Sequence, residues 1–265
     1  MIVDGRAIAA DIYREIENAI THLDTTPHLT VFTCAPNFET QKYLDLKRRK
    51  AQAVGIGVNV IEFPATITTE EVVQSINHAA MQTDGIIVQL PFPAHVDAEE
   101  VLKNIPPSLD VDAMHYDGTA TDILPPVVGA IATIAQRHDV LFATSQTLII
   151  GQGRLVGAPA KLWAEKMGAQ VSVVTKGSKD IIEKLHAAQI IITGAGVAGL
   201  VRAEQVMEGV IIFDAGTSEE GGELRGDVDP ACVEKATLFT PVPGGIGPIT
   251  VAILLRNLVR LVAKR

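Results

Sequence analysis

Short apolar runs of strand-forming residues recur along the chain, and stretches with helical periodicity lie between most of them. The runs occupy residues 29–35, 58–65, 85–91, 147–151, 170–175, 189–194, 209–216 and 237–241. The intervening helical periodicity is clearest in AIAADIYREIENAI (7–20), TQKYLDLKRRKAQAVG (40–55) and PAKLWAEKMG (159–168). Strands joined by helices pair in parallel and are covered on both faces. The alternation therefore predicts an α/β fold with largely parallel sheets.

The segment 105–128, IPPSLDVDAMHYDGTATDILPPVV, breaks this alternation with four prolines and several aspartates. We place a domain boundary near its end. The prediction is one domain over 1–125, completed by a C-terminal helix over 245–265, and a second domain over 126–244. We expect an active-site cleft between them.

Charge and cysteine content narrow the classes of partner. A formal net charge of -9 and an isoelectric point near 5.2 argue against nucleic acid, whose phosphates need a basic face. Cys34 and Cys232 form no CxxC or Cys/His spacing, and the seven histidines are scattered, so no disulfide framework and no metal site are predicted. Asp4, Arg6 and Asp11 interrupt the N-terminal apolar residues, so we expect no signal peptide and no membrane segment. A reducing cytoplasm fits this composition.

Two glycine-rich turns are candidates for binding a dinucleotide. GAGVAG (194–199) matches GxGxxG letter for letter, with Asp214 downstream as a possible ribose partner, whereas GQGRLVG (151–157) carries one extra residue. The helix expected after 151–157 is full and amphipathic, but the one after 194–199 is short, roughly 202–208. Because pyrophosphate binds at a well-formed helix N-terminus, we predict that Gly151, Gly153 and Gly157 hold it. Gly194 and Gly196 are expected beside the cofactor; the alternative is that either turn only packs.

The strand after the favoured turn predicts which dinucleotide binds. An NAD site would end this strand with Asp or Glu, but the sequence continues VVTKGSK. Thr175, Lys176 and Ser178, with Arg154 in the turn, supply hydroxyl and cationic groups instead. We therefore predict NADP; a solvated loop would leave the choice of cofactor open.

Tyr43 and Lys47 stand four residues apart in a predicted helix and so share one face. Such a pair is also typical of an ordinary amphipathic shoulder. Short-chain dehydrogenases use YxxxK as well, but they place it after the nucleotide-binding turn. Here it precedes that turn by about a hundred residues, which excludes that family.

Five motifs, taken in order and spacing, resemble those of the bifunctional methylenetetrahydrofolate dehydrogenase/methenyltetrahydrofolate cyclohydrolase family. They are YLDLK (43–47), VQLPFP (88–93), DVD (110–112), GQGRLVGAP (151–159) and TPVPGGIGPITVA (240–252). The resemblance covers essentially the whole chain. It implies a catalytic α/β domain that binds folate and a Rossmann-like domain that binds NADP, in a homodimer.

The resemblance also implies roles for individual residues. Lys47 is expected to be the central catalytic group, held by a hydrogen bond to Gln89, with Tyr43 stacked on the folate ring system. Asp112 is expected to accept hydrogen bonds from the donor edge of the pterin. The stretch TPVPGGIGPIT (240–250) is similar to the family's closing strap, which places Pro243, Gly244 and Gly245 against the substrate.

Some positions differ from the family pattern, and two other functions stay open. The family commonly has Gly where Ala113 follows DVD, and its VG and Ser appear here as Cys34, Ala35 and Thr40. LPPVVGA takes the place of a CTPxG-like segment. These differences bear on pocket shape and on the balance of the two activities.

The alternatives are a monofunctional NAD-dependent dehydrogenase of the same fold and a non-catalytic nucleotide-sensing module.

Overall fold

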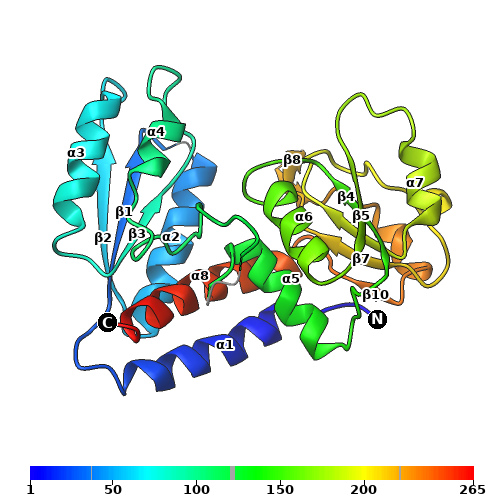
Figure 1. The fold of residues 1–265 in the computed structure, drawn as a ribbon, viewed down its shortest axis with the longest axis horizontal. Coiled ribbons are helices and arrows are strands. Elements are labelled where there is room, and N and C mark those ends of the chain that lie inside the picture. The colour runs from blue at the N-terminus through cyan, green and yellow to red at the C-terminus, as the bar shows by residue number, and fades with distance from the viewer. Residues whose placement is uncertain (37, 120–122, 221) are drawn as a thin grey trace. The chain divides into compact units, whose positions relative to one another are not determined.

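The computed structural model describes residues 1–36, 38–119, 123–220 and 222–265, which divide into two compact units (Figure 1). The five-stranded unit contains Met1–Ala10 and Pro125–Thr250, and the three-stranded unit contains Asp11–His115 and Val251–Arg265. Helices α1 (Gly5–Ile20) and α8 (Ile246–Val262) contribute residues to both units. The predicted α/β class with parallel sheets is confirmed. The bounds of the two units differ from the predicted domain bounds, because the first ten residues group with 125–250. The predicted domain bounds stay a prediction.

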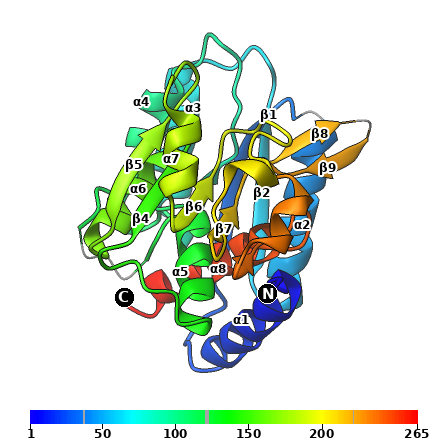
Figure 2. The same cartoon turned by 90° about the vertical axis from the view of Figure 1, so that its right-hand side faces the viewer.

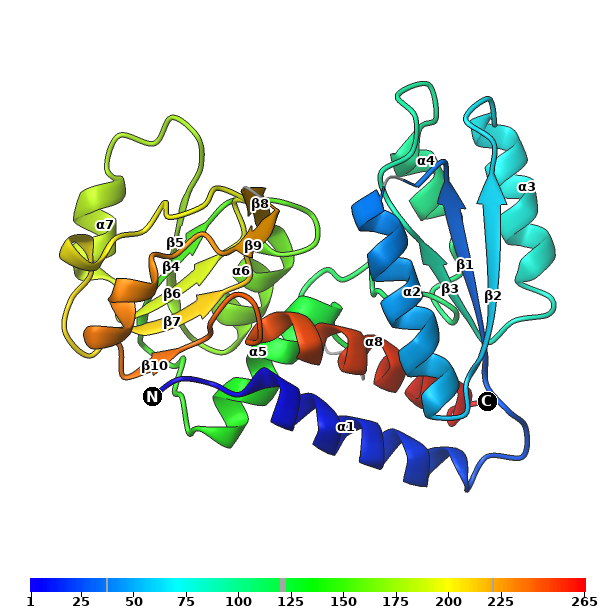
Figure 3. The same cartoon turned by 180° about the vertical axis from the view of Figure 1, so that it is seen from behind.

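The three-stranded unit is built on a parallel sheet in the order β2-β1-β3. Its elements are β1 (His28–Cys34), α2 (Phe38–Ala53), β2 (Gly57–Phe63), α3 (Thr69–Ala79), β3 (Gly85–Val88) and α4 (Ala98–Lys103). Figures 1 and 3 show α2 on one face of this sheet and α4 on the other. The central strand β1 is buried along nearly its whole length, whereas the edge strand β2 is largely exposed. A continuous apolar run therefore marks the middle of the sheet.

The five-stranded unit contains a parallel sheet in the order β10-β7-β6-β4-β5. Figure 2 labels β7, β6, β4 and β5 of this sheet, and Figure 3 also labels β10. Its elements are α5 (Pro126–Arg137), β4 (Gln146–Ile150), α6 (Gly157–Lys166), β5 (Gln170–Val174), α7 (Ile181–Ala187), β6 (Ile190–Thr193), β7 (Ile211–Asp214) and β10 (Leu238–Phe239). The chain runs outward from β4 to β5 and then returns to the other side of β4 to form β6. This reversal makes the gap between β4 and β6 the topological switch point, where open α/β sheets bind ligands beyond the carboxyl ends of the strands.

Four features of the five-stranded unit depart from the sequence expectation. The short helix expected over 202–208 is only a 3₁₀ turn, η1 (Ala203–Gln205), because the chain is already extended at Val206. An antiparallel hairpin of β8 (Ser218–Glu220) and β9 (Glu223–Arg225) and a second 3₁₀ helix, η2 (Pro230–Glu234), were not predicted. The N-terminal residues also pair with β10. The backbone N–H of Val3 donates to the Phe239 carbonyl, and the backbone N–H of Phe239 donates to the Met1 carbonyl, both at 2.9 Å.

Neither cysteine is in a disulfide, and both are buried. None of the helices in the described ranges has the length and apolarity needed to cross a membrane.

Candidate active site

Lys47 lies on the buried face of α2 and is only 6% exposed. That face also carries Leu44 at 4%, Ala51 at 0% and, just beyond the helix, Val54 at 5%. A lysine is rarely placed among apolar residues in this way, because burial removes water from its ammonium group. The competing interpretation of the Tyr43/Lys47 spacing was an ordinary amphipathic helix shoulder, and the burial of the Lys47 amine is unusual for such a position.

Two neighbouring side chains contact the Lys47 amine. Its Nζ donates a hydrogen bond of 2.9 Å to Oε1 of Gln89, which follows directly after β3. The same Nζ lies 4.7 Å from the centre of the Tyr43 ring, within the range of a cation–π contact. The predicted lysine–glutamine bond is thus present, and α2 and β3 bring together residues that are 42 positions apart.

The charges of Lys47 and Asp112 are coupled. Burial lowers the pKa of Lys47, and the carboxylate of Asp112 acts in the opposite direction. Burial likewise raises the pKa of Asp112 to about 6, with Lys47 opposing that rise and Asp110 adding to it. Burial also raises the pKa of Tyr43, and Asp112 adds to the effect. The site therefore holds an amine and a carboxyl whose pKa values are shifted toward each other, as in proton-transfer sites.

The loop that carries Asp112 is held by residues that the sequence analysis did not single out. Asp110, 2% exposed, accepts hydrogen bonds from the backbone N–H of His115 at 3.2 Å and lies 2.9 Å from its ring Nδ1. Asn257 on α8, 1% exposed, donates from Nδ2 to the carbonyl oxygens of Val111 at 2.9 Å and Leu124 at 2.8 Å. The residue before Asp112 is therefore fixed by a side chain 146 positions away, which no local motif could indicate.

Two alanines stand where the resembled family carries glycine, and both adopt the left-handed conformation. The φ angle is +39° at Ala35 and +51° at Ala113. A Cβ in this region costs about 1–2 kcal/mol, which glycine avoids. The backbone therefore adopts a glycine-like conformation at both positions.

The two glycine turns meet at the switch point of the five-stranded sheet. Gly151 follows β4 with φ +97°, and a Cβ there would lie 2.7 Å from the carbonyl oxygen of Gly194, which follows β6. A Cβ on Gly157, the first residue of α6, would lie 2.1 Å from the carbonyl oxygen of Gly151. Gly153 has no atom within 4 Å of a Cβ position, and Gly196 has φ +68°. Gly151 and Gly157 are thus required for the close packing of strand, turn and helix, as in a dinucleotide fold.

Asp214 is not available to a ribose. It is 1% exposed, and its carboxylate accepts hydrogen bonds from Thr193 Oγ1 at 2.8 Å and from the backbone N–H groups of Gly216 and Val228, both at 3.0 Å. The acid at the customary distance after GAGVAG therefore has an internal role, so the pattern match at 194–199 lacks its ribose partner.

The residues expected to select NADP lie in exposed turns at the ends of β4 and β5. Ser178 Oγ accepts a 3.1 Å hydrogen bond from the backbone N–H of Thr175, and Ser178 N–H donates back to the Thr175 carbonyl at 3.0 Å. Arg154 and Lys176 are both exposed. β4 and β5 are neighbours in the sheet, so both turns are at its carboxyl edge.

The proline–glycine stretch before α8 has backbone reasons for its composition. The Val242–Pro243 peptide bond is cis, and Gly244 has φ +111°. A Cβ on Gly245 would lie 2.7 Å from the Pro241 carbonyl oxygen, and one on Gly5 would lie 1.8 Å from the Gly245 carbonyl oxygen. Conformation and packing alone therefore account for both glycines, and contact of Pro243, Gly244 and Gly245 with substrate stays a prediction.

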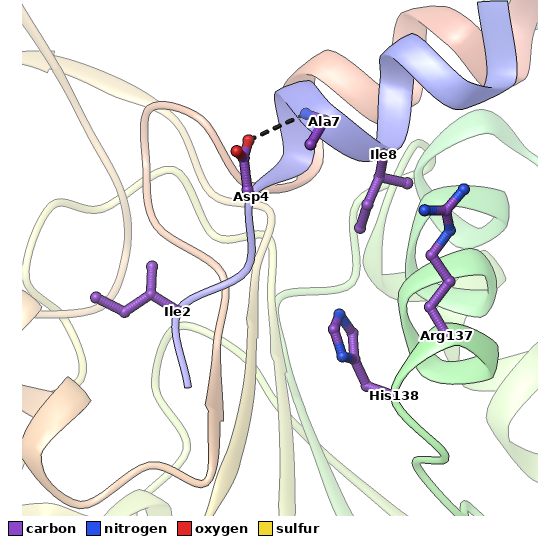
Figure 4. A pocket seen from close by; sticks show the side chains of 6 residues that line it. All are labelled: Ile2, Asp4, Ala7, Ile8, Arg137 and His138. Atoms are coloured by element: carbon purple, nitrogen blue, oxygen red, sulfur yellow. Dashed lines mark hydrogen bonds between the residues drawn. The ribbon is translucent and has the colours of Figure 1, made fainter. Parts of the chain in front are cut away.

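A pocket of about 520 Å³ lies in the five-stranded unit (Figure 4). It is lined by Ile2, Asp4, Ala7, Ile8, Arg137 and His138. The Asp4 carboxylate accepts from the backbone N–H groups of Arg6 and Ala7, both at 3.0 Å, so it caps the start of α1. None of the predicted site residues lines this pocket.

The fold and these residues define an α/β enzyme class that combines a nucleotide-binding sheet with a buried, lysine-centred site. Models of known families match residues 3–112 as "Tetrahydrofolate dehydrogenase/cyclohydrolase, catalytic domain" and residues 125–265 as its "NAD(P)-binding domain". The chain therefore belongs to the tetrahydrofolate dehydrogenase/cyclohydrolase family, and the predicted resemblance is confirmed.

Individual relatives match over nearly their whole length. The bifunctional protein FolD of Lactococcus lactis is 30% identical, with 100% of this chain and 98% of the relative covered. The bifunctional dehydrogenase/cyclohydrolase FolD of Campylobacter jejuni is 32% identical, with a TM-score of 0.96 and coverage of 100% and 99%. The Trypanosoma brucei enzyme, solved with NADP and an inhibitor, is 29% identical, with a TM-score of 0.92 and coverage of 100% and 97%.

Proposed function

We propose that this protein oxidises 5,10-methylenetetrahydrofolate with NADP and hydrolyses the resulting 5,10-methenyltetrahydrofolate to 10-formyltetrahydrofolate. The observation that carries the proposal is Lys47, 6% exposed, bonded to Gln89 at 2.9 Å and coupled in charge to Asp112. A buried amine of lowered pKa gives up its proton more readily than an exposed lysine does, and the hydrolytic step needs a neutral amine that can accept a proton.

The oxidation step requires little from the protein's acids and bases. NADP, when bound, accepts the hydride that leaves the methylene carbon, and no proton has to move in that step. The protein's part is to hold the folate and exclude water. Asp112 would accept two hydrogen bonds from the amino and ring N–H edge of the pterin, while Tyr43 would stack on its rings. Pro243, Gly244 and Gly245 would line the substrate.

The hydrolysis step requires a proton acceptor. Water attacks the methenyl carbon and loses a proton as the C–O bond forms. The bond from that carbon to N5 then breaks, N5 takes up the remaining hydroxyl proton, and the formyl group stays on N10. Lys47 Nζ would take that proton, with Gln89 Oε1 fixing the direction of the amine. The cationic substrate would lower the pKa of Lys47 further, so more of the amine would be in its neutral, proton-accepting form.

The five-stranded unit fits the dinucleotide. Gly151 and Gly157 allow the turn to close onto α6, since side chains there would overlap backbone atoms. Within the described ranges, no protein acceptor is found for the backbone N–H groups of Gln152 and Gly153, which leaves them for phosphate oxygens. Arg154, Thr175, Lys176 and Ser178 would contact the 2′-phosphate, with Gly194 and Gly196 beside the cofactor.

A coupled assay with methylenetetrahydrofolate and each nicotinamide cofactor tests the function. We expect reduction of NADP in preference to NAD, followed by loss of the methenyl absorbance as the ring opens. Reduction of NAD alone, with methenyltetrahydrofolate accumulating, would establish the monofunctional alternative. Binding of a nucleotide without any turnover would establish the sensing module. The chain retains Tyr43, Lys47, Gln89 and Asp112, which favours an enzyme over the sensing module.

Homodimerisation and a cytoplasmic location are also proposed. The first is supported only by the family resemblance. The second is supported by two free thiols, Cys34 and Cys232, in a chain with no CxxC spacing. Size-exclusion chromatography with light scattering tests the first, and fractionation of cells tests the second.

A further inference from the structure

The carboxylate of Asp227 occupies the backbone N–H groups of the GAGVAG turn. Its Oδ2 accepts a hydrogen bond of 2.7 Å from Ala195, and its Oδ1 accepts one of 2.8 Å from Val197. These are amides of the kind that bind a pyrophosphate in a dinucleotide fingerprint. Here a carboxylate from the protein itself is already in place.

Asp227 is buried in a space that a glycine leaves open. The residue is 0% exposed, and a Cβ on Gly216 would lie 2.0 Å from its carboxyl carbon. The adjacent backbone is bonded to the same turn, since Gly199 N–H donates to Gly226 at 3.2 Å and Val201 N–H donates to Asp227 at 3.0 Å. The carboxylate, the cleared space and the backbone bonds together fix residues 195–201 from one side.

The turn that Asp227 holds is the one that packs on the favoured phosphate turn. A Cβ on Gly151 would lie 2.7 Å from the Gly194 carbonyl oxygen and 3.2 Å from the Ala195 nitrogen. Ala195 N–H is one of the two groups bonded to Asp227. A shift of the GAGVAG backbone would therefore change its packing against Gly151.

We propose that Asp227 is a positioning residue for cofactor binding: its carboxylate takes the amides of GAGVAG and holds that turn against Gly151. The pyrophosphate then binds at GQGRLVG and not at GAGVAG, because a bound carboxylate both occupies the donors and repels a second anion. This inference rests on the proposed NADP-dependent function and adds the reason why one glycine turn is used over the other.

Asp227→Asn tests the proposal with little change of shape. Its amide oxygen can still accept one of the two hydrogen bonds, but its NH₂ group then faces the other backbone N–H. We expect the KM for NADP to rise about ten- to hundredfold, the range typical for losing a hydrogen bond to a charged group. The kcat at saturating NADP and the hydrolysis of added methenyltetrahydrofolate, which uses no NADP, should stay near parental values.

Asp229→Asn is the matched control. Asp229 is two residues away and caps η2, with Oδ1 accepting from Ala231 N–H at 2.9 Å. An asparagine caps almost as well, so the KM for NADP should not change. Trp163, the sole tryptophan, is 6% exposed on α6 of the same unit, so its fluorescence shows whether each variant has folded there.

Hydrogen exchange on the parental protein without NADP provides a second measurement that needs no variant. The amides of Ala195 and Val197 should be protected before cofactor is added. If they exchange freely and become protected only with NADP, they serve the ligand and the proposal is overturned. An unchanged NADP KM in a folded Asp227→Asn variant also overturns it. If the parental protein reduces no NADP, the proposed function fails, but amide exchange still decides the role of Asp227.

Discussion

Replacing Lys47 by methionine separates the two reactions proposed for one site. Methionine keeps most of the apolar stem of lysine and removes the amine, so the packing between Leu44 and Ala51 on α2 is retained. Without a proton acceptor, hydrolysis of methenyltetrahydrofolate should slow by about a hundred- to ten-thousandfold, the usual contribution of a general base. Oxidation of methylenetetrahydrofolate should continue at a reduced rate, because no proton moves in hydride transfer.

The structure also sets the expected effect of Lys47→Met on stability. The variant leaves Gln89 Oε1 without the 2.9 Å hydrogen bond from Nζ, which costs at most about 3 kcal/mol because Gln89 is only half-buried. It also removes an amine whose burial is unfavourable, as its lowered pKa indicates. The two effects oppose each other, so the free energy of unfolding should change by less than about 2 kcal/mol.

Lys50→Met is the matched control for Lys47→Met. Lys50 lies on the same helix, with its Nζ 5.1 Å from the ring centre of Tyr13, but it is only half-buried. Both reactions should proceed at parental rates in this variant. Stopped-flow absorbance of methenyltetrahydrofolate measures hydrolysis, and NADPH absorbance measures oxidation. If Lys47→Met hydrolyses methenyltetrahydrofolate at the parental rate, Lys47 is not the catalytic base.

Three further variants test the remaining assignments. Arg154→Ala should raise the KM for NADP far more than the KM for NAD; equal effects would remove Arg154 from the 2′-phosphate site. Burial raises the pKa of Asp112 to about 6, so the folded protein holds the protonated carboxyl more favourably than the unfolded chain does. The free energy of unfolding therefore falls as the pH rises from about 4 through 6 and the carboxyl ionises. Asp112→Asn should therefore raise the free energy of unfolding, measured in denaturant, by up to about 3 kcal/mol more at pH 8 than at pH 4. It should also weaken folate binding measured by calorimetry. A stability difference that does not change with pH would contradict the burial argument. Gly244→Ala should lower the Tm, because a Cβ at φ +111° costs about 1–2 kcal/mol of stability. It should also raise the KM for folate. If the kinetics are unaltered, Gly244 is needed only for the backbone conformation.

The parallel strands could be predicted because their burial on both faces produces continuous apolar runs. β1, β3, β4 and β6 all came from such runs, and their bounds differ from the prediction by only a few residues. The hairpin of β8 and β9 gave no such signal. Its residues are mostly charged and exposed, as in Glu223–Arg225, so neither apolar alternation nor a buried run marks them. The antiparallel pairing of Ser218 with Arg225 and of Glu219 with Leu224 therefore had no counterpart in the apolar pattern.

The lysine site could be predicted only in part, because one half of it is local and the other is not. Tyr43 and Lys47 share a helix, so their spacing places them together. The partners that make Lys47 unusual are distant: Gln89 is 42 residues away, and Asn257 fixes the Asp112 loop from 146 residues away. The family resemblance supplied Gln89 and Asp112, but it gave no reason for the lowered pKa of Lys47, which follows from burial.

The two glycine turns show why glycine spacing alone is not enough to choose between two candidate phosphate sites. A fingerprint counts glycines and their spacing, and on that count GAGVAG is the better match. Binding depends instead on whether the backbone N–H groups at the turn have an acceptor already. Those of Ala195 and Val197 do, because Asp227 reaches them at 2.7 and 2.8 Å from a segment about 30 residues further along the chain. The acid that fills the turn is as essential to the choice as the glycines, and only the folded chain brings the two together.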